Sequence, residues 1–275
     1  MNATRVIKDG CEAVFHQFDC LDEYLDAVTH QYDTERNTDF YGVATIGEAK
    51  ELARHGWPDG LEKIRKFKSS IENITARAIH EQELLFDNVG LDFDMALVLQ
   101  GTPECWFDYS PREEGKVVRI AYAVGVSASL NEDMIATRGA AIAALVDLLE
   151  MHGIRVELDC FYDFKTGMQE ERNFLCSVRV KDAGQPIDLD RMAFLLMHRG
   201  FNRCLAFSYT EQVIGRTQGW IGWSDVPFPT EGYDLIIERG FSGWSHYQSI
   251  GSMITWMKEQ LKAFGVNVDM DGEEK

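Results

Sequence analysis

Two serines that follow an apolar run are the residues best placed to carry chemistry. Ser127 and Ser129 stand at the end of the apolar run VVRIAYAVGVSAS, which starts at Val117, and a helical pattern follows them. Hydroxyl oxygens at the carboxyl end of a strand can coordinate a hard cation, or hold an anion at the next helix N-terminus. Ser129 and Glu132 also have the spacing of a capping box, so a structural role is open to Ser129. The sequence therefore predicts either a ligand site or an ordinary helix start.

Arg138 is the second candidate, because it is a charged residue on an apolar stripe. It lies three residues after Ile135 and four before Ile142, which places all three on one helical face. A buried guanidinium is costly unless it is paired. Arg138 is therefore expected either to contact a ligand or partner near the strand ends, or to bond a carboxylate or loop carbonyls inside the fold.

Three aspartates, Asp159, Asp163 and Asp234, fall near the ends of expected strands. They are candidates to pair with Arg138, or, as the alternative, to bind a divalent metal. No cofactor is expected apart from such a metal. The chain has no GxSxG, Walker-type, HExxH or GxGxxG motif. We therefore expect no catalytic residue and favour a protein that is not an enzyme. A metal-dependent enzyme acting on nucleic acid or phosphate esters is the alternative.

Aromatic residues gather in the glycine- and proline-rich segment 215–229. Trp220, Trp223 and Phe228 lie there without a periodic face to explain them. Exposed aromatic side chains on a loop form recognition surfaces, so Trp220 and Trp223 are candidate partner contacts. A loop folded back onto the core is equally consistent with this pattern.

The elements that position these residues are a strand, a helix and a strand between Val117 and Phe161. This order builds parallel strands with the helix on one face of the sheet, and such sheets bind ligands at the carboxyl ends of their strands. We predict an α/β fold with a mostly parallel sheet flanked by helices, Rossmann-like or A-type. Cys204–Tyr209 is expected to add a further strand.

The pattern divides the chain into three parts. Residues 1–90 are expected to form a mainly helical N-terminal appendage, residues 91–268 the α/β domain, and residues 269–275 a charged tail.

Composition narrows the class of partner. The formal net charge is −18, which argues against broad nucleic-acid binding, because phosphate contacts need a basic surface. A basic protein partner fits this charge, and so does an acidic inhibitor or DNA mimic that targets a host enzyme.

Other features bear on metal sites and location. The six cysteines form no CxxC pair, so a structural zinc site is not expected. No apolar segment reaches the roughly 20 residues that span a bilayer, and the N-terminus lacks a signal-peptide pattern. We expect no membrane partner and a cytoplasmic location. For a phage-encoded chain this is the host cytoplasm, with the virion as an alternative.

The segment Gly125-Val126-Ser127-Ala128-Ser129, with the helix and strand after it, resembles the first strand-helix-strand unit of a von Willebrand factor A-type domain. That family binds a divalent metal through Asp-x-Ser-x-Ser and mediates adhesion or partners with ATPases. This chain has Gly125 in place of the aspartate. The resemblance therefore implies a degenerate metal site and, by analogy, an AAA-type ATPase as a partner.

Three other segments, GEAKELARHGWPDG, LQGTPECWFDY and RGAAIAALVDLLEMHGIRVEL, together with the C-terminal Trp-plus-helix segment, resemble a family of uncharacterised proteins from bacteriophages and mobile elements. This resemblance implies a phage-type origin and no particular activity. The sequence thus favours a non-enzymatic interaction or assembly protein of phage type that binds a protein partner.

Overall fold

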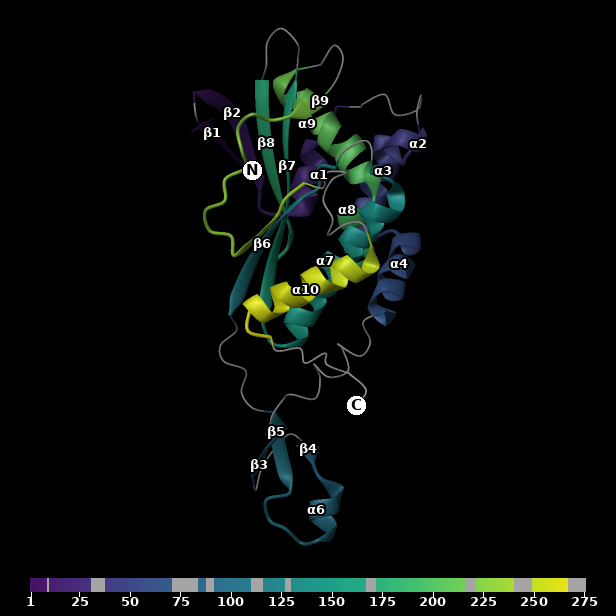
Figure 1. Ribbon diagram of the computed structural model, residues 1–275, viewed down its shortest axis with the longest axis vertical. Coiled ribbons are helices and arrows are strands. Elements are labelled where there is room, and N and C mark those ends of the chain that lie inside the picture. Colours follow the sequence, from purple (N-terminus) through teal and green to yellow (C-terminus); the bar gives the residue numbers. More distant parts are fainter. Residues whose placement is uncertain are drawn as a thin grey trace.

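The main body is built on a seven-stranded sheet flanked by helices (Figure 1). The computed structural model describes residues 1–8, 10–30, 38–70, 84–87, 92–109, 116–126, 130–166, 172–215, 221–239 and 249–266. The strands are β1 (Asn2–Lys8), β2 (Cys11–Phe18), β6 (Val117–Ala123), β7 (Arg155–Thr166), β8 (Arg172–Lys181), β9 (Ile221–Trp223) and β10 (Leu235–Ile237). Their order is β1-β2-β8-β7-β6-β10, with β9 paired to β7.

The sheet is mixed, which corrects the prediction of a mostly parallel one. β6 is parallel to β7 and to β10, as the strand-helix-strand unit requires, and β2 is parallel to β8. β7 runs antiparallel to β8 and β9, and β1 antiparallel to β2. Only five residues separate β7 from β8. A parallel pair needs a crossover of about a dozen residues or more, so these two strands must be antiparallel.

Residues 2–18 form two strands of the main sheet, where a mainly helical N-terminal region was expected. β1 and β2 pair as a hairpin in which Lys8 faces Cys11, and Gly10 adopts φ 83° in the turn. A two-residue loop of this kind needs positive φ, which glycine adopts without strain. β2 then pairs with β8. The expected helical character begins only after this hairpin.

Helices cover one face of the sheet (Figure 1). They are α1 (Leu21–Ala27), α2 (Thr38–Tyr41), α3 (Ile46–His55), α4 (Pro58–Ser69), α7 (Glu132–Met151), α8 (Leu189–Met197), the π-helix η2 (Gly200–Ala206), α9 (Phe207–Ile214) and α10 (Ile250–Ala263). Cys204–Tyr209 is helical, which corrects the expected strand. All but one of these six residues are buried, and a short apolar run does not distinguish a buried strand from a buried helix.

Helix α7 is the central helix, and its small residues let α8 approach closely. A Cβ on Gly139 would lie 2.4 Å from Met197 Cγ and 2.5 Å from the Leu196 carbonyl oxygen. The helix begins with Asn131, whose side chain accepts a hydrogen bond from the Met134 N–H at 2.8 Å. The N-cap is therefore Asn131, and the capping box considered for Ser129 is not the start of α7.

The opposite face of the sheet is covered by the chain after β9. Val226 is completely buried there, and the Phe228 ring stacks on Phe161 with 3.9 Å between ring centroids. The described part of the aromatic segment is thus folded onto the sheet, and Trp220 lies outside the described residues.

A second, smaller sheet lies apart from the main sheet in Figure 1. It has the order β3 (Leu84–Asp87), β5 (Trp106–Tyr109), β4 (Asp92–Phe93), with helix α6 (Met95–Leu99) between β4 and β5. We call residues 84–109 the small module. The expected boundary at residue 90 passes through this module, so it does not follow the two sheets. The expected tail, 269–275, lies outside the described residues.

Among the described helices, none combines the length and the apolar character needed to cross a membrane.

Candidate functional site

The carboxyl end of β6 is filled by an aromatic ring at the position where the sequence suggested a ligand site. Ser127 and Ser129 lie outside the described residues. Just before them, Gly125 packs under Trp223: a Cβ on Gly125 would lie 2.6 Å from Cζ3 of that ring. An aspartate at residue 125, as in A-type metal sites, would require Trp223 to move.

Asp163 and Arg239 form an ion pair beside this tryptophan. Their closest N–O distance is 3.1 Å, and the Arg239 guanidinium lies 4.8 Å from the centroid of the Trp223 ring. Burial raises the pKa of the Asp163 carboxyl to about 6, although the nearby Arg239 acts in the opposite direction. Asp163 is therefore a carboxylate held in a tight, poorly hydrated contact.

Arg138 is buried, as its place on the apolar stripe predicts, with 1% of its surface exposed. It donates to the Glu238 carbonyl oxygen at 2.5 Å and to the Tyr122 hydroxyl at 3.2 Å, and its guanidinium stacks over the Tyr122 ring. The Tyr122 hydroxyl in turn donates to the Leu196 carbonyl at 3.0 Å. Arg138 thus joins α7 to the chain leaving β10 and indirectly to α8.

The other two aspartates have separate partners. Asp159 pairs with Arg179 and accepts a hydrogen bond from the Tyr233 hydroxyl at 2.6 Å. Asp234 accepts from the Arg119 N–H at 2.8 Å. Asp234 precedes the first residue of β10, whereas Asp163 lies in β7 two residues beyond Phe161, the partner of the last residue of β6, so the two aspartates lie at opposite ends of the parallel strands. Within the described ranges, no three His, Cys, Asp or Glu residues are grouped so that they could hold a metal ion.

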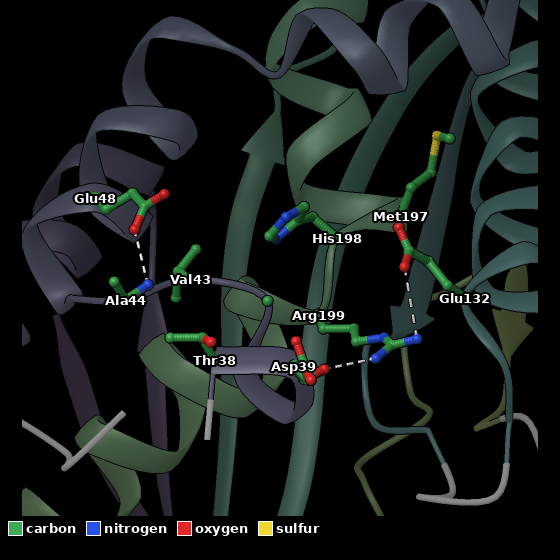
Figure 2. A pocket seen from close by; sticks show the side chains of 10 residues that line it. Thr38, Asp39, Val43, Ala44, Glu48, Glu132, Met197, His198 and Arg199 are labelled. Atoms are coloured by element: carbon green, nitrogen blue, oxygen red, sulfur yellow. Dashed lines mark hydrogen bonds and ion pairs between the residues drawn. The ribbon is translucent and has the colours of Figure 1, made fainter. Parts of the chain in front are cut away.

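An open cleft lies on the helical side of the molecule, among α2, α3, α8 and the first residue of α7 (Figure 2). Its volume is about 590 Å³, which is within the range of small-molecule sites. Its lining residues are Thr38, Asp39, Gly42, Val43, Ala44, Glu48, Glu132, Met197, His198 and Arg199. We call this site the α2–α8 cleft.

His198 projects into the cleft from the end of α8 (Figure 2). Its ring stacks on Phe194 and meets the edge of Trp57, with centroids 4.9 and 4.6 Å away. Burial lowers the pKa of His198 to about 4, so the imidazole is neutral at pH 7. Its Nδ1 accepts the Gly200 N–H at 3.0 Å, so the proton resides on Nε2. His198 is therefore a hydrogen-bond donor at neutral pH.

Two arginines attach α2 to the π-helix beside the cleft. Arg199 donates to the Asp39 carbonyl at 2.8 Å, and Arg203 donates to the Phe40 carbonyl at 3.0 Å. Arg203 also lies over the Phe40 ring, and burial lowers its pKa to about 10. The last carbonyls of a helix need donors from outside it. These arginines therefore fix one wall of the cleft. π-helical turns occur often at functional sites.

Two glutamates supply acceptors on the other walls. Glu48 accepts the Ala44 N–H at 2.7 Å and its own N–H bonds Thr45 Oγ1, so it belongs to the capping box of α3. Glu132 lies 3.6 Å from Arg199 and 3.5 Å from Lys63. Both carboxylates favour the protonated form of His198, so they oppose the larger effect of burial on its pKa.

Sequence reasoning did not find this cleft. His198 and Arg199 stand in the segment LMHRGFNR, which has no ligand spacing, and their partners are more than 60 residues distant in Glu132 and Asp39. Thr45 and Glu48 have the spacing of a capping box, which predicts only the start of a helix. The apolar run 192–206, which Arg199 and Arg203 interrupt, was the available sign in the sequence.

The small module exposes apolar side chains. The exposed fractions are 81% for Leu99, 57% for Met95 and 41% for both Phe93 and Val98, with Trp106 at 39%. Helix α6 is locally well formed, because the Asp94 side chain caps its N-terminus. The exposed residues are thus presented on an ordered element.

The family model described as a domain of unknown function (DUF7192) matches residues 4–268. No curated protein and no solved structure gives a significant match. The chain belongs to the DUF7192 family, whose description assigns no activity.

Proposed function

We propose that this chain is a non-enzymatic protein-interaction protein and that it engages its partner through the small module. The observation that carries the proposal is the apolar surface formed by Phe93, Met95, Val98, Leu99 and Trp106. Exposed apolar patches on soluble proteins commonly mark binding surfaces.

The size of the module supports this proposal. A three-stranded sheet with one helix of five residues is at the lower limit of what is stable in water, and it needs to bury an apolar face. The Phe93 and Trp106 rings contact each other edge to face, yet both remain exposed. A partner that covers this face would complete a small core.

Charge narrows the class of partner. The segment 84–109 contains five acidic residues and no Lys, Arg or His. Opposite charge at the rim of an interface steers association and excludes wrong partners. We therefore propose a protein partner with an apolar patch surrounded by basic residues. An AAA-type ATPase and a phage-type origin remain proposals that rest on the sequence resemblances alone.

Site-specific photocrosslinking tests this proposal. A photoreactive phenylalanine analogue is placed at Leu99 in one variant and at Ile7 in another, because Ile7 is also exposed, at 72%, but lies on β1. The expected result is one crosslinked partner that forms with Leu99 and not with Ile7. The partner is then purified, and its affinity for the wild-type chain and for the variant Leu99→Ser is measured by calorimetry.

We expect Leu99→Ser to weaken this complex about tenfold or more, as loss of an interface anchor does, while Ile7→Ser leaves the affinity unchanged. Crosslinks that form equally at both positions, or equal affinity of the two serine variants, would contradict the proposal. A Leu99 crosslink to a second copy of the chain would identify the partner as the chain itself.

A further inference from the structure

We propose that the α2–α8 cleft binds an organic cation, an alkylamine or alkylguanidinium, through Asp39, Glu48 and Glu132. The cation is either a free polyamine or the lysine or arginine side chain of a peptide. The inference rests on the cleft alone and is independent of the small module.

The charges of the lining side chains favour a cation. Three carboxylates, those of Asp39, Glu48 and Glu132, line the cleft together with one guanidinium, that of Arg199. The Lys63 ammonium, 3.5 Å from Glu132, adds a second cation beside the cleft. His198 adds no charge at neutral pH, because burial keeps its pKa near 4. The lining therefore carries an excess of negative charge, and the whole chain, at −18, reinforces it.

The carboxylates come from different elements and meet only in the cleft. Glu48 projects from the first turn of α3, Glu132 from the first turn of α7, and Asp39 from α2. Two of the carboxylates are held in place, Glu48 by the Ala44 N–H and Glu132 by Arg199 and Lys63, and Arg199 fixes the backbone of α2 at Asp39. A preorganised set of acceptors needs little rearrangement to receive an ammonium or guanidinium group.

The remaining walls match the rest of such a ligand. Val43, Ala44 and Met197 provide apolar contacts for an alkyl stem. His198 offers its Nε2–H to an acceptor, such as the carbonyl next to a basic side chain. Gly42 adopts φ 77°, and a Cβ there would lie 3.1 Å from His198 Cε1, so glycine keeps the space beside the imidazole open. A peptide-borne basic residue would use all of these features.

Calorimetry on the full chain tests the inference with defined probes. The cationic probes are N-acetyl-lysine amide, N-acetyl-arginine amide and free spermidine. N-acetyl-norleucine amide serves as the uncharged control of similar shape, and N-acetyl-glutamate amide as the anionic control. We expect the cationic probes to bind at least about tenfold more tightly than both controls, as loss of a charge-assisted contact predicts.

Matched variants place the binding in the cleft. Glu48→Gln removes a charge but keeps the capping box, which accepts glutamine, and Glu132→Gln removes the charge at the start of α7. Glu51→Gln and Asp133→Asn make the same changes at neighbouring positions on α3 and α7 that do not line the cleft. We expect only the first two variants to weaken cation binding, by about five- to tenfold each. Circular dichroism checks that all four variants fold.

Each outcome is decisive. Tight binding of the blocked lysine or arginine amide with weak binding of spermidine supports the inference and identifies a peptide as the source. The reverse order supports it and identifies a free amine. No saturable binding of any cationic probe, equal binding of the norleucine or glutamate amide, or equal loss in the Glu51→Gln control would overturn it.

Discussion

The strand end beside Gly125 and the α2–α8 cleft both bring carboxylates and an arginine together. The strand end is filled by side chains, whereas the cleft is open. At the strand end, a tryptophan ring fills the space over Gly125, and Asp163 is paired with Arg239. In the cleft, carboxylates and a histidine line about 590 Å³ of open space. Burial favours the neutral form of a side chain in each region: it raises the pKa of Asp163 to about 6 and lowers that of His198 to about 4.

This difference shows that the place where a fold usually binds ligands need not be where a particular chain does so. The carboxyl ends of the parallel strands are the customary site of α/β sheets, yet here Trp223 and Arg239 close the described part of that region. The helices added on one face create a second concave surface. The strand end is therefore expected to respond to mutation mainly through stability, and the cleft mainly through binding.

The largest effect is expected from Arg138 at the closed end. Arg138→Met would leave the Glu238 carbonyl without this donor and remove the stack on Tyr122, so we expect the free energy of unfolding to fall by about 3 kcal/mol. Urea unfolding followed by circular dichroism measures it. Arg65→Met, which alters an arginine whose side chain is 65% exposed, should change stability by less than about 0.5 kcal/mol. Equal effects would show that Arg138 is not a structural link.

Asp163 and His198 should make opposite contributions to the pH dependence of the free energy of unfolding. The folded state raises the pKa of Asp163 from 3.8 to about 6, so it binds this proton more tightly than the unfolded chain. The resulting stability is lost as pH rises from about 4 to about 6, and we expect a loss of about 2 to 3 kcal/mol from this group. The folded state lowers the pKa of His198 from 6.5 to about 4, so stability is gained as pH rises over that interval.

The variants Asp163→Asn and His198→Asn should therefore change the pH slope in opposite directions. Urea unfolding at several pH values between 4 and 7 measures both slopes. Relative to the wild type, stability should increase more with pH in Asp163→Asn and less in His198→Asn. Slopes that shift in the same direction, or that do not shift, would show that the two groups are not in the environments described.

A smaller effect is expected from restoring the aspartate of an A-type site. Gly125→Asp places a side chain against the Trp223 ring and should cost about 2 kcal/mol of stability. In the Trp223→Ala background the cost should fall by at least about 1 kcal/mol, which a double-mutant cycle detects. Strictly additive effects would mean that the ring does not occupy this space.

The smallest effect on stability is expected in the cleft. Glu48→Gln keeps its capping interaction, and Glu132→Gln alters a pair of long, partly exposed contacts, so each should change the free energy of unfolding by less than about 1 kcal/mol. Thermal and urea unfolding measure these changes. A loss comparable to that of Arg138→Met would make the cleft carboxylates structural and would remove the contrast between the two regions.

The sequence was informative where local patterns determine structure. The run Val117–Ala123 and the helix after it predicted β6, α7 and their parallel neighbour, because that periodicity is local. The hairpin of β1 and β2 was missed although Asp9-Gly10 is a typical turn signal. The short connection before β8 likewise indicated an antiparallel pair. Both features were readable, and they make the sheet mixed.

The cleft was not readable in the same way. It depends on α2, α3, α7 and α8 meeting in space, and on Arg199, just before the π-helix, and Arg203, within it, donating to the α2 carbonyls. No spacing within one segment encodes such a meeting. The packing of Trp223 over Gly125 is also a tertiary contact. The sequence could therefore point to this region, but it could not show that a side chain fills it.

Fluorine NMR of the chain labelled with 5-fluorotryptophan tests the contrast most directly. Trp57 contacts His198 at the cleft and Trp223 covers Gly125 at the strand end, and the variants Trp57→Phe and Trp223→Phe assign their signals. On titration with N-acetyl-lysine amide, we expect the Trp57 signal to shift with saturation and the Trp223 signal to stay in place. A saturable shift of Trp223 with Trp57 unmoved would contradict the account.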